Sequence, residues 1–248
     1  MTNNNMYFVA NWKMYGNLSS INSIKSVKIF NQSKKLKNIK IIYCPPFTLL
    51  RPLVKKLKNS KISVGAQNCH HNSDFGPFTG SVNAKMVKSV GCKYIILGHS
   101  ENRYIGETDK IINLKIKSAL KENLKVIFCI GEKLNEIKKR SSILKKQLKS
   151  LPIRFSSKDI IIAYEPVWAI GTGKTPTIKE ISNIHKSIRK MIYKKIGKEA
   201  LKISILYGGS VNQNNSENIL NLSDVDGALV GGASLKSKDF CKIIDSSN

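Results

Sequence analysis

The chain has 248 residues and a formal net charge of +26, with 42 lysine or arginine residues against 16 aspartate or glutamate residues. Its length is typical of one α/β barrel, and a hydrophobic content of 41% is enough to bury a sizeable core. No apolar run approaches the roughly 18 residues that a membrane span needs, and no secretory signal is recognisable, so we expect no membrane insertion.

Eight short apolar runs alternate along the chain with lysine-rich segments of helical pattern. The runs predict β-strands at residues 7–11, 40–44, 62–67, 94–98, 125–129, 160–165, 203–207 and 227–230. Helices are predicted at residues 20–35, 49–59, 83–89, 109–123, 136–150, 178–196, 216–222 and 238–244. Strict alternation predicts parallel strands covered by helices. Eight such units in this length favour a closed (β/α)8 barrel over an open doubly wound sheet, as one domain spanning residues 1–248.

The sixth predicted strand carries the clearest chemical signal. Its β-branched run ends abruptly in Glu165, and Pro166 follows at once. The next residues are apolar as far as Ile170, and Gly171 and Gly173 come just after them. A carboxylate at the tip of a buried strand, beside an apolar loop with glycine hinges, is typical of a general base under a closing lid.

Other chemically reactive side chains also end or follow predicted strands. They are Asn11, Lys13, His99, Glu101 and Cys129. Active sites of α/β barrels lie at the carboxyl ends of the strands, so we expect this set to share one pocket with Glu165. A free cysteine usually packs as a small hydrophobic residue, and we assign no chemistry to Cys129.

Several short motifs, in this order, resemble those of the triosephosphate isomerase family. They are FVANWKM at residues 8–14, IILGHSE at 95–101, CIGE at 129–132, IIIAYEPVWAIGTGKTPT at 160–177, YGGSV at 207–211 and LVGGASL at 229–235. The resemblance implies a TIM barrel and an isomerase of glycolysis and gluconeogenesis. Such an enzyme interconverts dihydroxyacetone phosphate and glyceraldehyde 3-phosphate through an enediolate, without a metal or an organic cofactor.

The resemblance also implies roles for the residues at the strand ends. Glu165 matches the general base, and His99 matches the neutral imidazole that donates to the developing oxyanion, in a family that is itself a standard example of this pairing. Lys13 matches a fixed positive charge beside the substrate, with Asn11 next to it. Glu101 is expected to pair with Lys13.

Further positions match the family's substrate-binding residues. Four of them are expected to present backbone N–H groups to the phosphate: Gly171, Ser210, Gly231 and Gly232. Ile170 on the lid and Leu229 on the last strand are expected to form an apolar clamp around the base.

The connection after the third predicted strand, from Cys69 to Gly80, is unusually long. Loops of this length without a helix are usually functional. In the family this loop inserts beside the neighbouring subunit's active site, so the resemblance implies a homodimer formed through it. The family's ion pair across that interface lacks both charged partners here, because Ser81 and Asn102 are neutral. Pro176 replaces a common alanine in the distal hinge of the lid.

The five cysteines are an odd number without metal-type spacing, at Cys44, Cys69, Cys92, Cys129 and Cys241. They predict reduced, mostly buried thiols, as in a cytoplasmic protein.

The strong positive charge has two interpretations. Lysine clusters, such as those at residues 55–58, 138–140 and 194–195, fall in or beside predicted helices around the chain. Only 7% of residues are aromatic, so a lysine-rich composition with solvated helix faces is favoured over a nucleic-acid site. We therefore expect no specific nucleic-acid partner, and a field that attracts anionic substrates.

Two other classes of function stay open at this point. One is a protein whose main role is binding RNA or another polyanion. The other is a different phosphate-binding barrel enzyme, which would lack the combination of Asn11, Lys13, His99 and Glu165.

Overall fold

The computed structural model describes residues 5–33, 38–170 and 175–247. Eight parallel strands close into a barrel in chain order, because β8 pairs with β1 as well as with β7. The strands are β1 Met6–Asn11, β2 Ile39–Cys44, β3 Ser63–Ala66, β4 Tyr94–Leu97, β5 Lys125–Ile130, β6 Ile160–Tyr164, β7 Ile205–Tyr207 and β8 Gly227–Val230. The predicted parallel (β/α)8 barrel, a TIM barrel, is confirmed.

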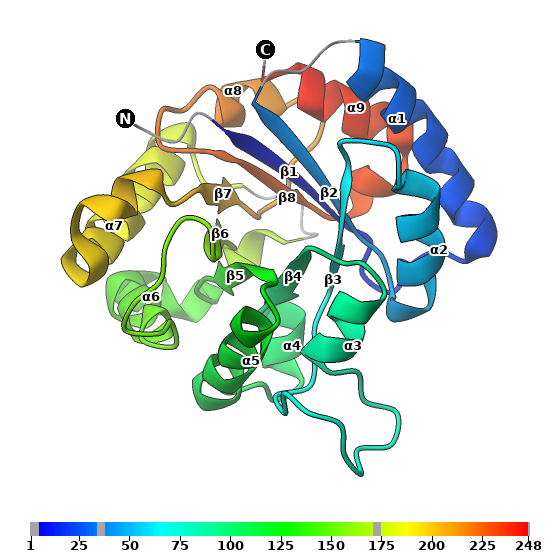
Figure 1. The fold of residues 1–248 in the computed structure, drawn as a ribbon. Helices are drawn as coiled ribbons and strands as arrows, with labels where there is room; N and C mark the ends of the chain where they lie inside the picture. The colour runs from blue at the N-terminus through cyan, green and yellow to red at the C-terminus, as the bar shows by residue number, and fades with distance from the viewer. Residues whose placement is uncertain (1–4, 34–37, 171–174, 248) are drawn as a thin grey trace.

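Helices surround the strands (Figure 1). The α-helices are α1 Ile24–Ser33, α2 Phe47–Leu57, α3 Ala84–Ser89, α4 Ser100–Tyr104, α5 Asp109–Lys121, α6 Arg140–Leu148, α7 Ile178–Ile196, α8 Ser216–Leu220 and α9 Ser237–Asp245. Short 3₁₀ segments are η1 Leu18–Ser23, η2 Leu134–Lys139, η3 Val167–Ala169, η4 Gly197–Lys202 and η5 Gly232–Leu235. Helix α9 lies beside α1, so the last helix completes the ring next to the first (Figure 1).

Successive residues of a strand belong to two different apolar layers. In β1, Val9 is part of the cluster inside the barrel, whereas Phe8 and Ala10 belong to the layer between strands and helices. All three are fully buried. Burial on both faces explains why the strands read as continuous apolar runs and not as alternating ones.

Strand β7 and helices α1 and α6 begin later than the sequence predicts. The helix expected from residue 20 starts as the 3₁₀ segment η1, and α1 follows only from Ile24. Strand β7 starts at Ile205, because Ile203 still closes the η4 turn through its N–H bond to the Ala200 carbonyl at 3.3 Å. The helix expected from residue 136 starts as the 3₁₀ segment η2, and α6 follows only from Arg140. In η2 the Glu136 carboxylate accepts from the Lys133 N–H at 2.8 Å, which favours a tight first turn.

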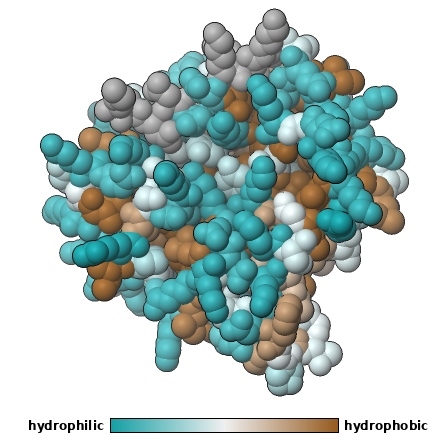
Figure 2. Space-filling model, in the orientation of Figure 1, coloured by the Kyte–Doolittle hydropathy of each residue, from teal (hydrophilic) through white to brown (hydrophobic). Residues whose placement is uncertain are grey.

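The thiols and the surface agree with the composition. All five cysteines are free, and all but Cys241 are buried, as predicted. Within the described residues, no helix combines the length and the apolar character that a membrane span requires. Hydrophilic side chains cover much of the visible face, with apolar patches between them (Figure 2).

His185 is a buried titratable group on the inner face of α7. Its Nδ1–H donates to the Asp224 carbonyl at 3.0 Å, and its ring stands edge-on to Tyr164 at 6.0 Å between ring centres. Burial lowers the pKa of His185 to about 4, against an opposing effect of the Asp224 hydrogen bond and with a smaller contribution from Arg189. The folded protein therefore keeps this imidazole neutral in mildly acidic solution.

We expect His185 to weaken the fold between pH 6.5 and pH 4. Above pH 6.5 the ring is neutral in both folded and unfolded chains, so it adds no pH dependence. Below that value the unfolded chain takes up a proton that the folded chain excludes, and stability should fall by on the order of 3 kcal/mol by pH 4. Urea unfolding of the wild type and of His185→Gln across this pH range measures this loss of stability. If the free energy of unfolding changed with pH equally in the two proteins, His185 would not be its cause.

Candidate active site

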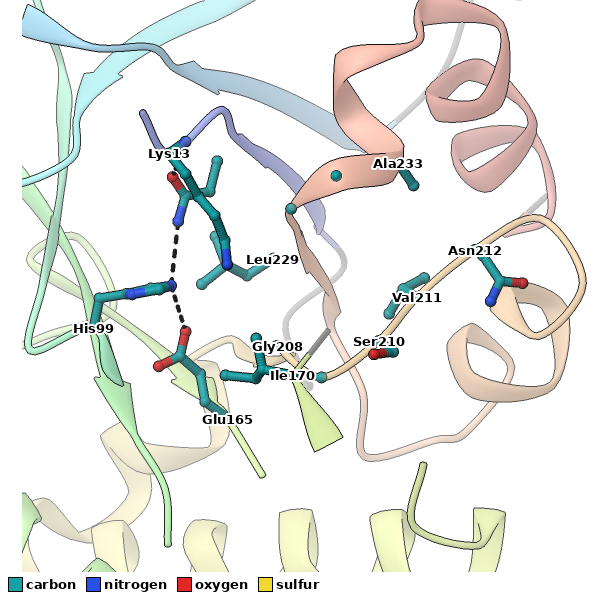
Figure 3. Close-up of a pocket in the computed structure, with 14 residues that line it drawn as sticks. Lys13, His99, Glu165, Ile170, Gly208, Ser210, Val211, Asn212, Leu229 and Ala233 are labelled. Carbon is teal, nitrogen blue, oxygen red and sulfur yellow. Dashed lines mark hydrogen bonds and ion pairs between the residues drawn. The ribbon is translucent and has the colours of Figure 1, made fainter. Parts of the chain in front are cut away.

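The residues singled out from the sequence meet at the carboxyl ends of the strands (Figure 3). They line one cavity of about 270 Å³, to which the following contribute: Asn11, Lys13, His99, Glu165, Ile170, Ser210, Leu229, Gly231 and Gly232. Glu101 stands beside the cavity, paired with Lys13. Gly171, predicted as a phosphate donor, lies outside the described residues.

Glu165 follows β6 directly and is 2% exposed. Its Oε2 accepts from the backbone N–H of Ser100 at 3.0 Å, and its Oε1 lies 3.1 Å from His99 Nε2 (Figure 3). Space for this carboxylate depends on Gly208, because a Cβ there would stand 3.0 Å from Glu165 Cγ. The strand-tip carboxylate is therefore buried, with Oε2 held by a hydrogen bond and Oε1 facing the imidazole.

His99 is the N-cap of the short helix α4. Its Nδ1 accepts from the backbone N–H of Glu101 at 3.2 Å. A ring nitrogen that accepts needs a free lone pair, so the imidazole is neutral and its proton sits on Nε2, facing Glu165. The Asn11 amide Nδ2 is 3.2 Å from the same Nε2. Because Nε2 is already protonated, the Asn11 N–H stays available to a substrate oxygen.

Lys13 follows β1 with a φ of 51°, a left-handed conformation that costs a residue with a side chain about 1–2 kcal/mol. Its N–H donates to Asn11 Oδ1 at 3.0 Å, and its carbonyl accepts from Gln67 at 2.8 Å. Its ammonium pairs with Glu101 at 2.7 Å, the partner that the sequence predicted. The stem passes over Gly231, where a Cβ would stand 3.4 Å from Lys13 Cε. Lys13 follows the first strand, and this backbone conformation lets its side chain reach the turn after β8.

Glycine-rich turns after β7 and β8 form another wall of the cavity. The Ser210 hydroxyl donates to the Ala169 carbonyl at 2.6 Å, which ties the turn after β7 to the start of the lid. Gly231 and Gly232 have no side chains, so a phosphate oxygen can approach their backbone closely. The cavity therefore combines a carboxylate and an imidazole with an ammonium group and backbone donors.

Glu132 anchors the first part of the lid. Its side chain is fully buried, and its Oε1 accepts from Tyr164 at 3.0 Å, from the Trp168 indole at 3.2 Å and from Arg140 at 2.8 Å. The Glu132 carbonyl also accepts from the Val167 N–H at 3.1 Å. One residue at the end of β5 therefore holds strand β6, the lid and α6 together.

Cys129 is buried beside Glu165. Burial, followed by the charge of Glu165, raises the pKa of its thiol well above the usual range, so the sulfur packs as a neutral group, as predicted. Among the described residues, no three His, Cys, Asp or Glu side chains come close enough together to hold a metal ion.

Sequence reasoning missed part of the site. Gly208 and Glu132 were given no role, although both lie in motifs that were recognised as a whole. Four more residues that line the cavity were also missed: Gly209, Val211, Asn212 and Ala233. The signal was present, because YGGSV and CIGE stand directly after predicted strands, but neither motif states which of its residues reaches the pocket.

Strand-tip acid–base groups and glycine-rich turns at the carboxyl face place the chain in the class of (β/α)8-barrel enzymes. The family model described as Triosephosphate isomerase matches residues 6–247. The chain belongs to the triosephosphate isomerase family, so the isomerase class predicted from the motifs is confirmed.

Individual relatives agree with the family match. A triosephosphate isomerase of Alkaliphilus oremlandii is 42% identical over 95% of this chain and 96% of its own length. One of Fusobacterium nucleatum is 41% identical, over 98% of this chain and 99% of its own. The crystal structure of triosephosphate isomerase from Bartonella henselae superimposes with a TM-score of 0.90 at 37% identity, covering 97% of this chain and 98% of that one.

Proposed function

We propose that this protein interconverts dihydroxyacetone phosphate and D-glyceraldehyde 3-phosphate by proton transfer through an enediolate, in glycolysis and gluconeogenesis. The observation that carries the mechanism is the contact of 3.1 Å between a buried carboxylate and a neutral imidazole, Glu165 Oε1 and His99 Nε2, inside one cavity. The Glu165 carboxylate removes a proton from the carbon next to the carbonyl and returns it to the neighbouring carbon. The His99 N–H donates to the oxygen on which negative charge develops.

The remaining residues bind and orient the substrate. The Lys13 ammonium and the Asn11 amide stabilise the oxyanion and the phosphate charge, and Glu101 positions the ammonium. Ile170 and Leu229 exclude water around the base, which strengthens the electrostatic contacts inside the cavity. The phosphate is bound by backbone N–H groups of Ser210, Gly231 and Gly232, with Gly171 as a fourth donor. No cofactor takes part.

A coupled assay of isomerisation on the purified, tag-free chain tests this proposal. The wild type should turn over dihydroxyacetone phosphate. Glu165→Asp keeps the charge but withdraws it from the substrate carbon, so this variant should be slower. Absence of turnover in the correctly folded wild type would reject the proposed activity.

We infer that two copies pair through the loop from Cys69 to Gly80. This loop projects from the barrel between β3 and α3 (Figure 1). Phe75 in this loop is 65% exposed. Two neighbouring segments also expose large apolar side chains: Met14 after β1 at 93% and Tyr104 at the end of α4 at 85%. The segments adjoin, since Gln67 bonds the Lys13 carbonyl and Asn68 bonds Glu107. Exposed apolar groups gathered in this way favour a protein interface.

Phe75→Asp should therefore shift the protein to monomers and lower its activity, because a charge would have to be buried in the interface. Ile153→Asp is the matched control, since Ile153 is 87% exposed in the connection between α6 and β6. Sedimentation velocity on both variants makes the comparison. A monomeric wild type, or equal dissociation of both variants, would refute the pairing.

The location and the domain boundary complete the proposal. The free thiols support a cytoplasmic location. We propose that residues 1–248 form one domain, which the single closed barrel of the described residues supports.

A further inference from the structure

A second cavity lies at the amino ends of the strands, opposite the active site. Its volume is about 1120 Å³. It is lined by the first residues of three strands, Ile39 of β2, Ser63 of β3 and Tyr94 of β4, and by the turns that precede them. The strands are parallel, and His99 and Glu165 follow their carboxyl ends. We call this cavity the basal groove.

Four lysines line the basal groove: Lys40, Lys58, Lys61 and Lys93. All four are exposed, and none forms an ion pair or a side-chain hydrogen bond with another described residue. The described residues that line the groove include no aspartate or glutamate. Their other polar groups are side-chain amides, serine hydroxyls and one tyrosine. By contrast, Lys13 and Lys115 each pair with a glutamate.

The positive charge of this groove extends to the barrel interior. Lys125 is the first residue of β5, and its ammonium lies 3.2 Å from the hydroxyl of Tyr7 on β1. Burial lowers the pKa of Lys125 to about 8, and repulsion from Lys40 contributes in the same direction, against the attraction of Asp159. An anion bound near Lys40 would relieve this repulsion.

We propose that the basal groove binds a linear polyphosphate chain of three or more phosphates, either free or as the tail of a nucleoside triphosphate. Ammonium, hydroxyl and amide donors all suit phosphate oxygens, and several lysines match several negative charges on one narrow ligand. A helix C-terminus explains only Lys58, the C-cap of α2. Lys40 lies on β2, and Lys61 and Lys93 lie in the connections just before β3 and β4.

The lining favours polyphosphate over single-stranded RNA. Bound RNA strands usually stack their bases on aromatic side chains. Among the described lining residues only Tyr94, the first residue of β4, is aromatic, and it is partly buried. The groove therefore offers charge without a stacking platform.

Titration calorimetry with inorganic tripolyphosphate on the full chain, at physiological ionic strength, tests this site. The groove variant is Lys58→Gln with Lys61→Gln. The matched control is Lys145→Gln with Lys146→Gln on the exposed face of α6, which lowers the net charge equally. We expect the groove variant to bind about tenfold more weakly or worse, the control to bind as the wild type does, and isomerase activity to be unchanged in both.

Each other result has a defined meaning. Equal weakening in both variants would show that binding follows net charge and would overturn the site. Undiminished binding by the groove variant, or none by the wild type, would overturn it too. In a second arm, ATP that binds as tightly as tripolyphosphate supports recognition of the tail, whereas weaker ATP binding supports free polyphosphate. A short single-stranded oligoribonucleotide that displaces tripolyphosphate at lower concentration than ATP would replace the proposal with RNA binding.

Discussion

Glu165→Gln is expected to lower kcat by about 10²–10⁴-fold while leaving the fold intact, because an amide cannot accept the substrate proton. The side chains are nearly equal in size, and glutamine can still accept the Ser100 N–H bond that now reaches Glu165 Oε2. Steady-state turnover in a coupled assay, together with circular dichroism, makes the measurement.

Glu122→Gln provides the matched control for that loss. Glu122 is the C-cap of α5, just before the amino end of β5, and it does not line the cavity. Its variant should keep full turnover. Near-normal kcat in a folded Glu165→Gln protein would remove Glu165 from the role of base.

Gly131→Ala should damage both the fold and the site. Gly131 follows β5, and a Cβ at this position would stand 1.7 Å from the carbonyl oxygen of Glu165. The Gly131 backbone is also fixed by two bonds of 2.8 Å to the Gln147 amide. The two strand ends must therefore separate, which we expect to cost at least about 3 kcal/mol and to lower Tm by roughly 6–12 °C. Turnover should fall as well, because Glu165 moves with its backbone.

Gly232→Ala is the control for this effect on stability. A Cβ at Gly232 meets no described atom within 4 Å, so Tm should change little. Thermal unfolding of both variants and of the wild type measures this difference in Tm. A Gly131→Ala protein as stable as the wild type would mean that β5 and β6 do not approach this closely.

The barrel could be predicted because the same local pattern, an apolar strand followed by a helix, repeats along the chain. Each strand is buried on both faces, so each appears in the sequence as an unbroken apolar run. The position of His99 was equally readable, since an apolar run ends just before it. The late start of β7 could not be predicted from the sequence. Ile203 is an apolar residue next to the strand, and nothing in its type shows that its N–H closes the η4 turn.

Contacts between distant strand ends were beyond sequence reasoning. The Ser100 N–H bond to Glu165 joins residues 65 positions apart, and no spacing rule signals it. The shared hydrogen bonds of Glu132 likewise form only when β5, β6 and the lid come together. The basal groove has the same origin, because Lys40, Lys61 and Lys93 come together only when β2, β3 and β4 pair.

The left-handed backbone of Lys13 has a consequence for protein engineering. Glycine or asparagine adopts this conformation with less strain than lysine, so either should raise the thermal stability of the chain slightly while removing the ammonium from the cavity. A library selected for heat resistance alone would therefore be drawn toward inactive sequences at this position. Selection for stable variants of this protein has to include turnover from the first round.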